Sequence, residues 1–282
     1  MPREQLRQQA TETLLTLSGG RYVNPEGDSV TLTDPIRTAV ERSELWTPDG
    51  LATLLAQRPA RDGPRFETEF VVTNQTTLEA ASYHGTHPRG DAVLCLNFAS
   101  GTKPGGGFAR GAQAQEESLA RASALYPTLA AHPGFYDANR ASGTALYTDH
   151  VIHSPDVPVF RDDDGTYLST PYDASFLTAP AVNAGLVRRH EPHRTDEILP
   201  TMARRIARIL TLAEHLGYVH LILGAWGCGV FRNDPAAIAR MFADELRPPG
   251  RLAGRFRTVR FAVLDRAPFD ILRPFQRTFA SR

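Results

Sequence analysis

Residues 93–117 read VLCLNFASGTKPGGGFARGAQAQEE, and this stretch decides the fold of the chain. The apolar run from Ala92 to Phe98 has the length of a buried strand, and a helical pattern begins near Gln113. Between them, Gly105, Gly106 and Gly107 lack a Cβ, so the loop can adopt positive φ and approach a ligand closely. Successive N–H groups in such a loop can converge on a phosphate. The stretch therefore predicts a strand, a phosphate-binding loop and a helix that starts with two carboxylates, Glu116 and Glu117.

The segments on either side alternate between strand and helix patterns. Strands are expected at 70–73, 92–98, 176–182, 219–223 and 259–264, and helices at 76–81, 198–213 and 235–246. Apolar strands that alternate with helices predict an α/β fold, a three-layer α/β/α sandwich around a mixed sheet. Both glycine-rich loops, at 105–107 and 227–229, follow strands, and open α/β sheets bind ligands at strand ends.

The first 65 residues have a different pattern. A helix is expected over 3–17, ending at Gly19-Gly20, followed by a small hairpin of 21–23 with 30–32 and a second helix from Asp34. A loop rich in Arg, Pro and Gly, residues 58–65, comes next. We therefore predict a small N-terminal α+β accessory region, 1–65, and a catalytic domain, 66–282.

Composition excludes several classes of protein. Lys plus Arg and Asp plus Glu number 31 each, so the formal net charge is zero, unlike a typical binder of duplex nucleic acid. The start of the chain is polar, and the longest apolar run is too short to cross a bilayer. Two cysteines, Cys95 and Cys228, give no disulfide framework. We expect a monomeric cytoplasmic protein without membrane attachment.

The triple glycine and Gln115-Glu116-Glu117, separated by the seven residues 108–114, resemble the signature of poly(ADP-ribose) glycohydrolases of the bacterial type. The segments 93–100, 146–149, 154–160 and 223–235 are also similar to that family, so the resemblance covers about residues 66–270. It implies a macrodomain-like fold and hydrolysis of the ribose–ribose O-glycosidic bonds of poly(ADP-ribose), which releases ADP-ribose. It also implies ADP-ribosylated proteins as partners, and neither a metal nor an organic cofactor.

Glu116 and Glu117 are expected to have different roles, because adjacent residues on a helix point about 100° apart. The resemblance implies that Glu117 protonates the leaving ribose and then activates water. It implies that Glu116 holds ribose hydroxyls. Gln115 could support either carboxylate by hydrogen bonding, and we predict that it is also a substrate-binding residue. Taken without the glycines, a Glu pair is more often a solvated helix start.

The remaining predicted site residues would bind the substrate. The amides of Gly105, Gly106, Gly107 and Phe108 should approach the distal ribose and pyrophosphate, and Asn97 and Ser100 should bond that ribose. For Asn97, satisfying the backbone at a strand end is an equal alternative. A second phosphate loop is expected at Gly227, Cys228, Gly229, Val230 and Phe231, with Phe231 stacking on the ligand. The alternative there is a tight turn with a buried Phe.

Other chemistry is less well supported. Cys228 lacks the glycines of a nucleophile elbow two residues to either side, which favours a small buried thiol. The pairs His84/His87, His150/His153 and His190/His193 have no companion ligands that complete a metal site. Residues 162–165 are expected to form a hairpin turn, and Arg204, Arg205 and Arg208 a solvated helix face.

Two other functions fit the same ADP-ribose-binding loops. A reader would hold ADP-ribose without cutting it, but the intact Gln115-Glu116-Glu117 argues against it because binding needs no acid there. A related hydrolase would remove single ADP-ribose groups from protein or nucleic acid.

Overall fold

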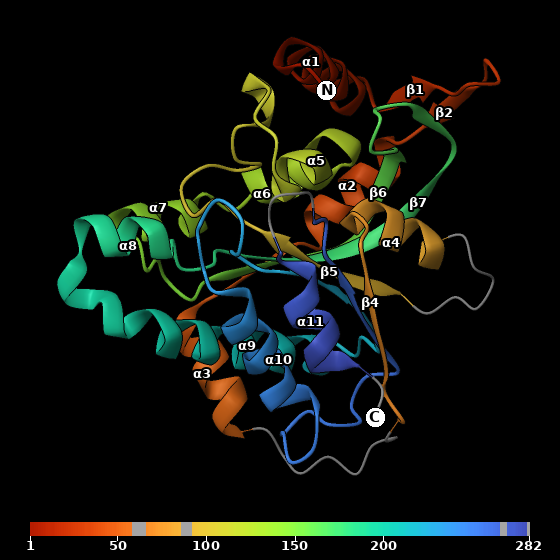
Figure 1. The fold of residues 1–282 in the computed structure, drawn as a ribbon. Helices are drawn as coiled ribbons and strands as arrows, with labels where there is room; N and C mark the ends of the chain where they lie inside the picture. Colours follow the sequence, from red (N-terminus) through yellow and green to blue (C-terminus); the bar gives the residue numbers. More distant parts are fainter. Residues whose placement is uncertain (58–65, 86–91, 266–269, 281–282) are drawn as a thin grey trace.

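The structure, a computed structural model, describes residues 1–57, 66–85, 92–265 and 270–280. Within these residues a seven-stranded mixed sheet lies between two layers of helices (Figure 1). Its strands are β3 (Glu44–Trp46), β4 (Glu69–Thr73), β5 (Val93–Phe98), β6 (Val151–Arg161), β7 (Tyr167–Ala179), β8 (His220–Leu223) and β9 (Thr258–Ala262). The predicted α/β/α sandwich is confirmed.

The strand order across the sheet is β3-β6-β7-β5-β8-β9-β4. The five strands β7, β5, β8, β9 and β4 run parallel to one another. The long strands β6 and β7 form an antiparallel hairpin, and β3 pairs antiparallel with β6 at the edge. Because β5 and β8 are parallel neighbours, the two glycine-rich loops that follow them leave the same end of the sheet.

Successive side chains of β5 point to opposite faces of the sheet, so the strand contributes to two hydrophobic cores. Leu94 and Leu96 pack into the core below the sheet in Figure 1, together with α9 (Ile198–His215) and α10 (Pro235–Leu246). Val93 and Cys95 face the opposite core, formed with α4 (Thr77–Gly85), α5 (Gln115–Ala122) and α6 (Leu125–Ala130). Both faces of the strand are therefore buried, as expected for a central parallel strand.

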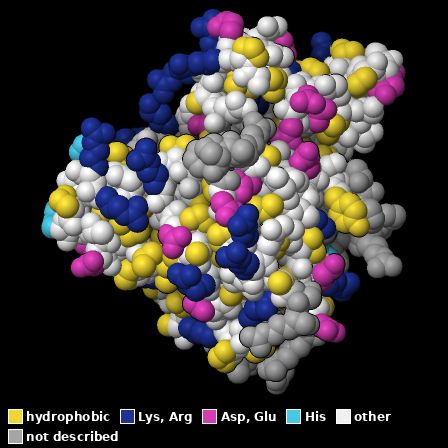
Figure 2. Space-filling view, viewed as in Figure 1, with side chains coloured by type: hydrophobic (Ala, Val, Ile, Leu, Met, Phe, Trp, Pro, Cys, Tyr) yellow, Lys and Arg dark blue, Asp and Glu magenta, His cyan; other side chains and the backbone are white. Residues whose placement is uncertain are grey.

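The remaining helices cover the two faces and the ends of the sheet. They are α1 (Arg3–Gly19), α2 (Thr33–Glu41), α3 (Pro48–Gln57), α7 (Pro133–Ala141), α8 (Ala184–His190) and α11 (Leu272–Phe279), with 3₁₀ turns η1 (Phe108–Arg110) and η2 (Pro192–Glu197). In the described part of the chain, no helix is long and apolar enough to cross a membrane. On the face drawn in Figure 2, side chains of both charges are interspersed.

Several local predictions are confirmed at the level of hydrogen bonds. The Glu79 carboxylate accepts from the Thr76 N–H at 2.7 Å, and the Glu79 N–H donates to Thr76 Oγ1 at 3.0 Å. These two hydrogen bonds form a reciprocal capping box, and α4 begins where the sequence predicts a helix at 76–81. Residues 162–165 form the turn between β6 and β7, where Asp162 accepts from the N–H groups of Gly165 and Thr166. Gly20 ends α1 in a left-handed conformation, at φ 63°.

The region before residue 66 contributes to the main sheet. Its hairpin of β1 (Arg21–Val23) and β2 (Ser29–Thr31) forms as expected, but β3 joins the seven-stranded sheet through β6. Helix α1 contacts η1 and α5, so it lies against the loop and helix that carry the predicted site. The division into 1–65 and 66–282 stays a prediction, and residues 58–65, where the boundary falls, lie outside the described residues.

Candidate active site

The glycine loop of residues 101–107 wraps around the two carboxylates at the start of α5. Gly105 and Gly106 have φ of 65° and 60°, which favour glycine. A Cβ on Gly106 would lie 2.3 Å from Glu117 Oε1 and 3.1 Å from Glu116 Oε2. A side chain at this position would therefore displace a carboxylate, so the glycine is needed for the contact itself.

The backbone N–H groups of this loop donate hydrogen bonds to acceptors of the chain itself. The N–H of Gly107 donates to Glu117 Oε1 at 2.9 Å, and that of Gly106 donates to the Lys103 carbonyl at 3.0 Å. The Phe108 N–H donates to the Gly105 carbonyl at 3.2 Å, and the Phe108 ring is buried beside Tyr126. The binding of ribose and pyrophosphate by these four residues stays a prediction.

Glu116 is a buried carboxyl, with only 2% of the residue exposed. Its Oε2 accepts from the Ser100 N–H at 2.7 Å, and its Oε1 lies 3.5 Å from Asn97 Nδ2. Burial raises the pKa of Glu116 from an ordinary value of 4.5 to about 8, helped by the charge of Glu117, although the hydrogen bonds lower it. At neutral pH, Glu116 is therefore mainly a neutral acid.

Glu117 is half-buried, and Gly107 donates to one of its oxygens. The two neighbouring glutamates thus have different environments, as predicted from the helix geometry. Glu116 is buried against the end of β5, and Glu117 faces the glycine loop.

The Gln115 side chain forms its hydrogen bonds with groups other than Glu116 and Glu117. Its Oε1 accepts from the Phe98 N–H at 2.8 Å, and its Nε2 donates to the Leu96 carbonyl at 2.8 Å and to Thr77 Oγ1 at 3.1 Å. The side chain therefore ties the start of α5 to the end of β5. Substrate contact by Gln115 stays a prediction.

Asn97 and Ser100 lie where the sequence placed them, at the end of β5. Asn97 is fully buried and donates to Thr178 Oγ1 of the neighbouring strand at 3.1 Å, so it links two strand ends. Its Oδ1 is buried without a protein partner among the described residues. The Ser100 hydroxyl accepts from the Thr102 N–H at 3.3 Å.

The second loop, residues 224–234, presents free amides. Within the described part of the chain, the N–H groups of Gly229, Val230 and Phe231 donate to no protein acceptor. Val230 is 78% exposed, and Phe231 is half-buried. Three successive unpaired N–H groups are suited to bind an anion.

The base of the second loop is closely packed and hydrogen-bonded. Gly227 has φ 72°, and a Cβ there would lie 2.6 Å from both Ala181 Cβ and Asn233 Nδ2. The Asn233 amide donates to the carbonyls of Val182 and Gly227 at 2.8 and 3.0 Å. Cys228 is a buried free thiol whose pKa is raised by burial, as expected for a thiol that packs rather than reacts.

Tyr147 is a site residue to which the sequence assigned no role. It adopts φ 59°, and a Cβ on Gly101 would lie 2.7 Å from its ring. Its ring centroid is 6.2 Å from that of Phe231, and burial raises the pKa of its hydroxyl. The Tyr147 ring therefore lies between the glycine loop and the second loop. The signal that could have revealed Tyr147 was the similarity of residues 146–149 to the family.

The prediction of a solvated arginine face on α9 is wrong. Arg205 is fully buried, Arg208 is 13% exposed at its side chain, and Arg204 is half-exposed. All three pair with the buried Asp149. The position of Arg205, three residues after Met202 and four before Ile209, puts it on the apolar face of the helix and could have revealed its burial.

No cluster of potential metal ligands occurs among the described residues. His150 Nδ1 is bonded to Thr148 Oγ1 at 2.9 Å, and His153 Nε2 to the Tyr218 hydroxyl at 2.9 Å. His87 lies outside the described residues.

The sheet, the strand-end loops and the carboxylate pair define a macrodomain-like α/β protein. A family model for the microbial-type PARG catalytic domain matches residues 10–162. The chain belongs to this family, the microbial poly(ADP-ribose) glycohydrolases.

Solved structures of this family cover nearly the whole chain. The poly(ADP-ribose) glycohydrolase of Thermomonospora curvata is 45% identical over 98% of this chain and 100% of its own, with a TM-score of 0.91. The same enzyme bound to the inhibitor ADP-HPD gives 45% identity, 98% of each chain and a TM-score of 0.88. The Deinococcus radiodurans enzyme in complex with ADP-ribose gives 43% identity, 86% of this chain, 96% of that chain and a TM-score of 0.80. Comparison with curated proteins found no match.

Proposed function

We propose that the chain hydrolyses the ribose–ribose O-glycosidic bonds of poly(ADP-ribose) and releases ADP-ribose, with Glu117 as the acid and base. Its membership of the glycohydrolase family and its likeness to enzymes bound to ADP-ribose and to an inhibitor support this function. The observation that carries the role of Glu117 is its position: a half-buried carboxylate held against the glycine loop by the Gly107 N–H.

The reaction needs a proton donor on the leaving side of the bond. The carboxyl of Glu117 gives its proton to the leaving ribose oxygen as the glycosidic bond breaks, and positive charge develops at the anomeric carbon. The Glu117 carboxylate then takes a proton from a water molecule, whose oxygen bonds to that carbon. Glu117 is thereby returned to its starting state.

Glu116 has a supporting role in this proposal. Its raised pKa leaves it mainly neutral, so it adds little negative charge beside a substrate that already carries a pyrophosphate. A neutral carboxyl can also donate a hydrogen bond to a ribose hydroxyl. Gln115 and Asn97 hold the strand end in place, and Ser100 contributes its N–H to Glu116.

The two loops would divide the substrate between them. Gly105, Gly106, Gly107 and Phe108 form the wall beside the distal ribose. The free amides at Gly229, Val230 and Phe231 bind the pyrophosphate, with Gly227 and Cys228 as their base and the Phe231 ring against the ligand. Cytoplasmic location and action on ADP-ribosylated proteins belong to the same proposal.

Purified protein should be incubated separately with defined poly(ADP-ribose), a mono-ADP-ribosylated protein and ADP-ribosylated DNA, with and without chelator. We expect free ADP-ribose from the polymer at a rate that chelator leaves unchanged, because carboxylate chemistry needs no Lewis acid. Cleavage of a mono-ADP-ribosylated substrate alone would contradict the proposed specificity. Binding without any product would identify a reader instead.

A further inference from the structure

Tyr147 adopts a backbone conformation that its own side chain disfavours. Its φ of 59° lies in the left-handed region, where a residue with a bulky side chain is uncommon. Such a residue persists only where surrounding contacts determine its conformation. The neighbours of Tyr147 along the chain supply these contacts.

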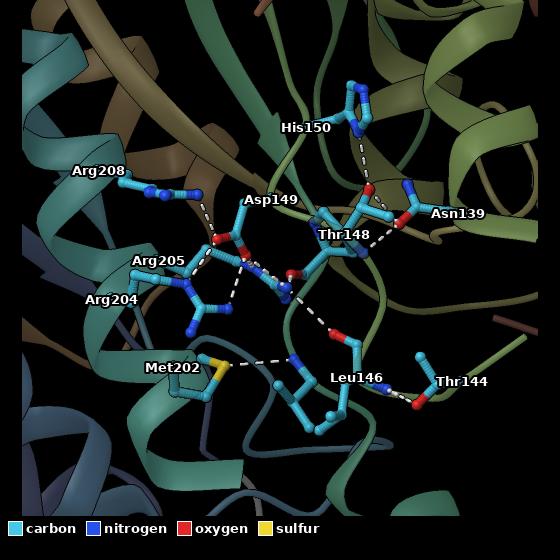
Figure 3. Close-up of polar contacts among 12 residues, drawn as sticks. Asn139, Thr144, Leu146, Thr148, Asp149, His150, Met202, Arg204, Arg205 and Arg208 are labelled. Carbon is cyan, nitrogen blue, oxygen red and sulfur yellow. Dashed lines mark hydrogen bonds and ion pairs between the residues drawn. The ribbon is translucent and has the colours of Figure 1, made fainter. Parts of the chain in front are cut away.

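The residues on both sides of Tyr147 form hydrogen bonds with buried side chains (Figure 3). Before it, the Leu146 carbonyl accepts from Arg205 Nη2 at 3.1 Å. After it, the Thr148 N–H and hydroxyl both donate to Asn139 Oδ1, at 2.8 and 2.9 Å. The next residue, Asp149, is 6% exposed and lies against the arginines of α9.

The Arg205 guanidinium donates to three acceptors on two segments, 146–149 and the end of β7. Its Nε donates to Asp149 Oδ1 at 2.9 Å, its Nη2 to the Leu146 carbonyl, and its Nη1 to the Pro180 carbonyl at 2.6 Å. Pro180 follows β7, so the guanidinium joins the turn that carries Tyr147 to the end of a central strand. Lysine cannot reproduce this planar set of donors.

We propose that Arg205 is a positioning residue for the ligand site. With Asp149 and the Thr148–Asn139 pair, it holds Tyr147 in its left-handed conformation. The Tyr147 ring then stays between Gly101 of the glycine loop and Phe231 of the second loop. This inference rests on the proposed function, because it requires ADP-ribose to bind between these two loops.

The test compares Arg205→Lys with the wild type by steady-state kinetics and by calorimetric titration of ADP-ribose. We expect about a tenfold rise in the KM for the polymer and in the Kd for ADP-ribose, with kcat changed by less than about twofold. Arg255→Lys is the matched control, because Arg255 also forms an ion pair that is largely buried, with Glu214 near the C-terminal end of α9. This control should keep the wild-type KM. Unchanged KM and Kd in Arg205→Lys would overturn the proposal.

A double-mutant cycle shows whether Arg205 acts through Tyr147. In a Tyr147→Ala background, Arg205→Lys should change the Kd for ADP-ribose by less than about twofold, because the ring that it positions is absent. A tenfold loss in both backgrounds would mean that Arg205 acts by another route, which overturns the proposal.

Two further outcomes are distinguishable. If Arg205→Lys does not fold, Thr148→Val loosens the other side of Tyr147 and leaves the buried charges intact. Thr148→Val should raise the Kd for ADP-ribose about threefold in the wild-type background and leave it unchanged in the Tyr147→Ala background. An unchanged Kd in the wild-type background, or a rise in the Tyr147→Ala background, would contradict the inference. Absence of ADP-ribose binding by the wild type would overturn both this inference and the proposed function. Binding without hydrolysis would overturn the proposed function alone, because the comparison of Kd values would still test the role of Arg205.

Discussion

At residue 106, the backbone of the glycine loop and two carboxylates come within contact distance. The close approach, together with a φ of 60°, leaves no room for a side chain. The glycine loop is therefore complementary in shape to the start of α5, which carries both carboxylates.

We expect Gly106→Ala to lower kcat/KM by at least about a hundredfold, because its Cβ would push Glu117 from its place and small displacements of a catalytic group are costly. The control is Gly19→Ala, where a Cβ would meet nothing within 4 Å and φ is not in the left-handed region. Steady-state kinetics on the polymer, with circular dichroism to verify folding, would check this. Near-wild-type turnover in Gly106→Ala would show that the contact between loop and carboxylate is dispensable.

Glu116 makes the stability of the protein depend on pH. Its folded pKa of about 8 lies above the ordinary 4.5, so the folded state binds more protons than the unfolded state between these values. The free energy of unfolding should fall as pH rises from 4.5 to 8, by up to about 1.4 kcal/mol per pH unit from this group.

Glu116→Gln cannot ionise, so we expect it to be more stable than the wild type at pH 8, by on the order of 2–4 kcal/mol. The difference should disappear near pH 4.5. Urea unfolding at both pH values would measure it. A stability difference that does not vary with pH would mean that Glu116 is not held neutral by burial.

Among the elements of the site, the second loop has three successive N–H groups without an acceptor in the described part of the chain, and we propose that they bind the ligand. Phe231→Ala removes a stacking surface that contributes about 0.5–1.5 kcal/mol beyond its buried area. We expect the Kd for ADP-ribose to rise about tenfold in calorimetric titrations, since tenfold corresponds to about 1.4 kcal/mol. Leu199→Ala, at an exposed apolar position on α9, is the control and should bind normally. Wild-type affinity in a folded Phe231→Ala would place the ligand elsewhere.

Elements with local signals could be predicted from the sequence. The Thr76–Glu79 capping box fixes the start of α4, and Asp234-Pro235 fixes the start of α10, where Asp234 accepts from the N–H groups of Ala236 and Ala237. The triple glycine and the carboxylates it encloses were also evident, because the spacing of residues along one segment carries the information.

Features made by contacts between distant segments could not be predicted. The conformation of Tyr147 depends on Arg205 and Asn139, which come from two different helices. The short strand β3 is defined by its pairing with β6, more than a hundred residues later. The amphipathic pattern of α9 predicted the helix. The prediction that its arginines are all exposed was wrong because Arg205 lies among apolar positions on the buried face.

Across the whole molecule, the N-terminal helix α1 packs against α5, the helix that carries Glu116 and Glu117. Ala10 of α1 packs with Phe108 and Ala120, and Thr13 donates to the Arg121 carbonyl at 2.6 Å in a buried contact. These contacts therefore cross the predicted domain boundary.

Thr13→Val removes the hydroxyl and leaves the Arg121 carbonyl without this donor. We expect it to lower the free energy of unfolding by about 1–3 kcal/mol, the cost of an unsatisfied buried polar group. Thr11→Val is the matched control on the same helix, because its hydroxyl bonds the Arg7 carbonyl at the exposed surface and should cost less than about 0.5 kcal/mol. Denaturant unfolding measures both, and equal effects would argue against the buried contact.

The most direct measurement is the turnover of poly(ADP-ribose) by Glu117→Gln, paired with calorimetric titration of ADP-ribose into the same variant. Glutamine keeps the shape and the Gly107 hydrogen bond but supplies no carboxylic acid. We predict that turnover is abolished while the Kd for ADP-ribose stays within about threefold of the wild type. A Glu117→Gln variant that retains most of its activity would contradict the assignment of Glu117 as the acid and base.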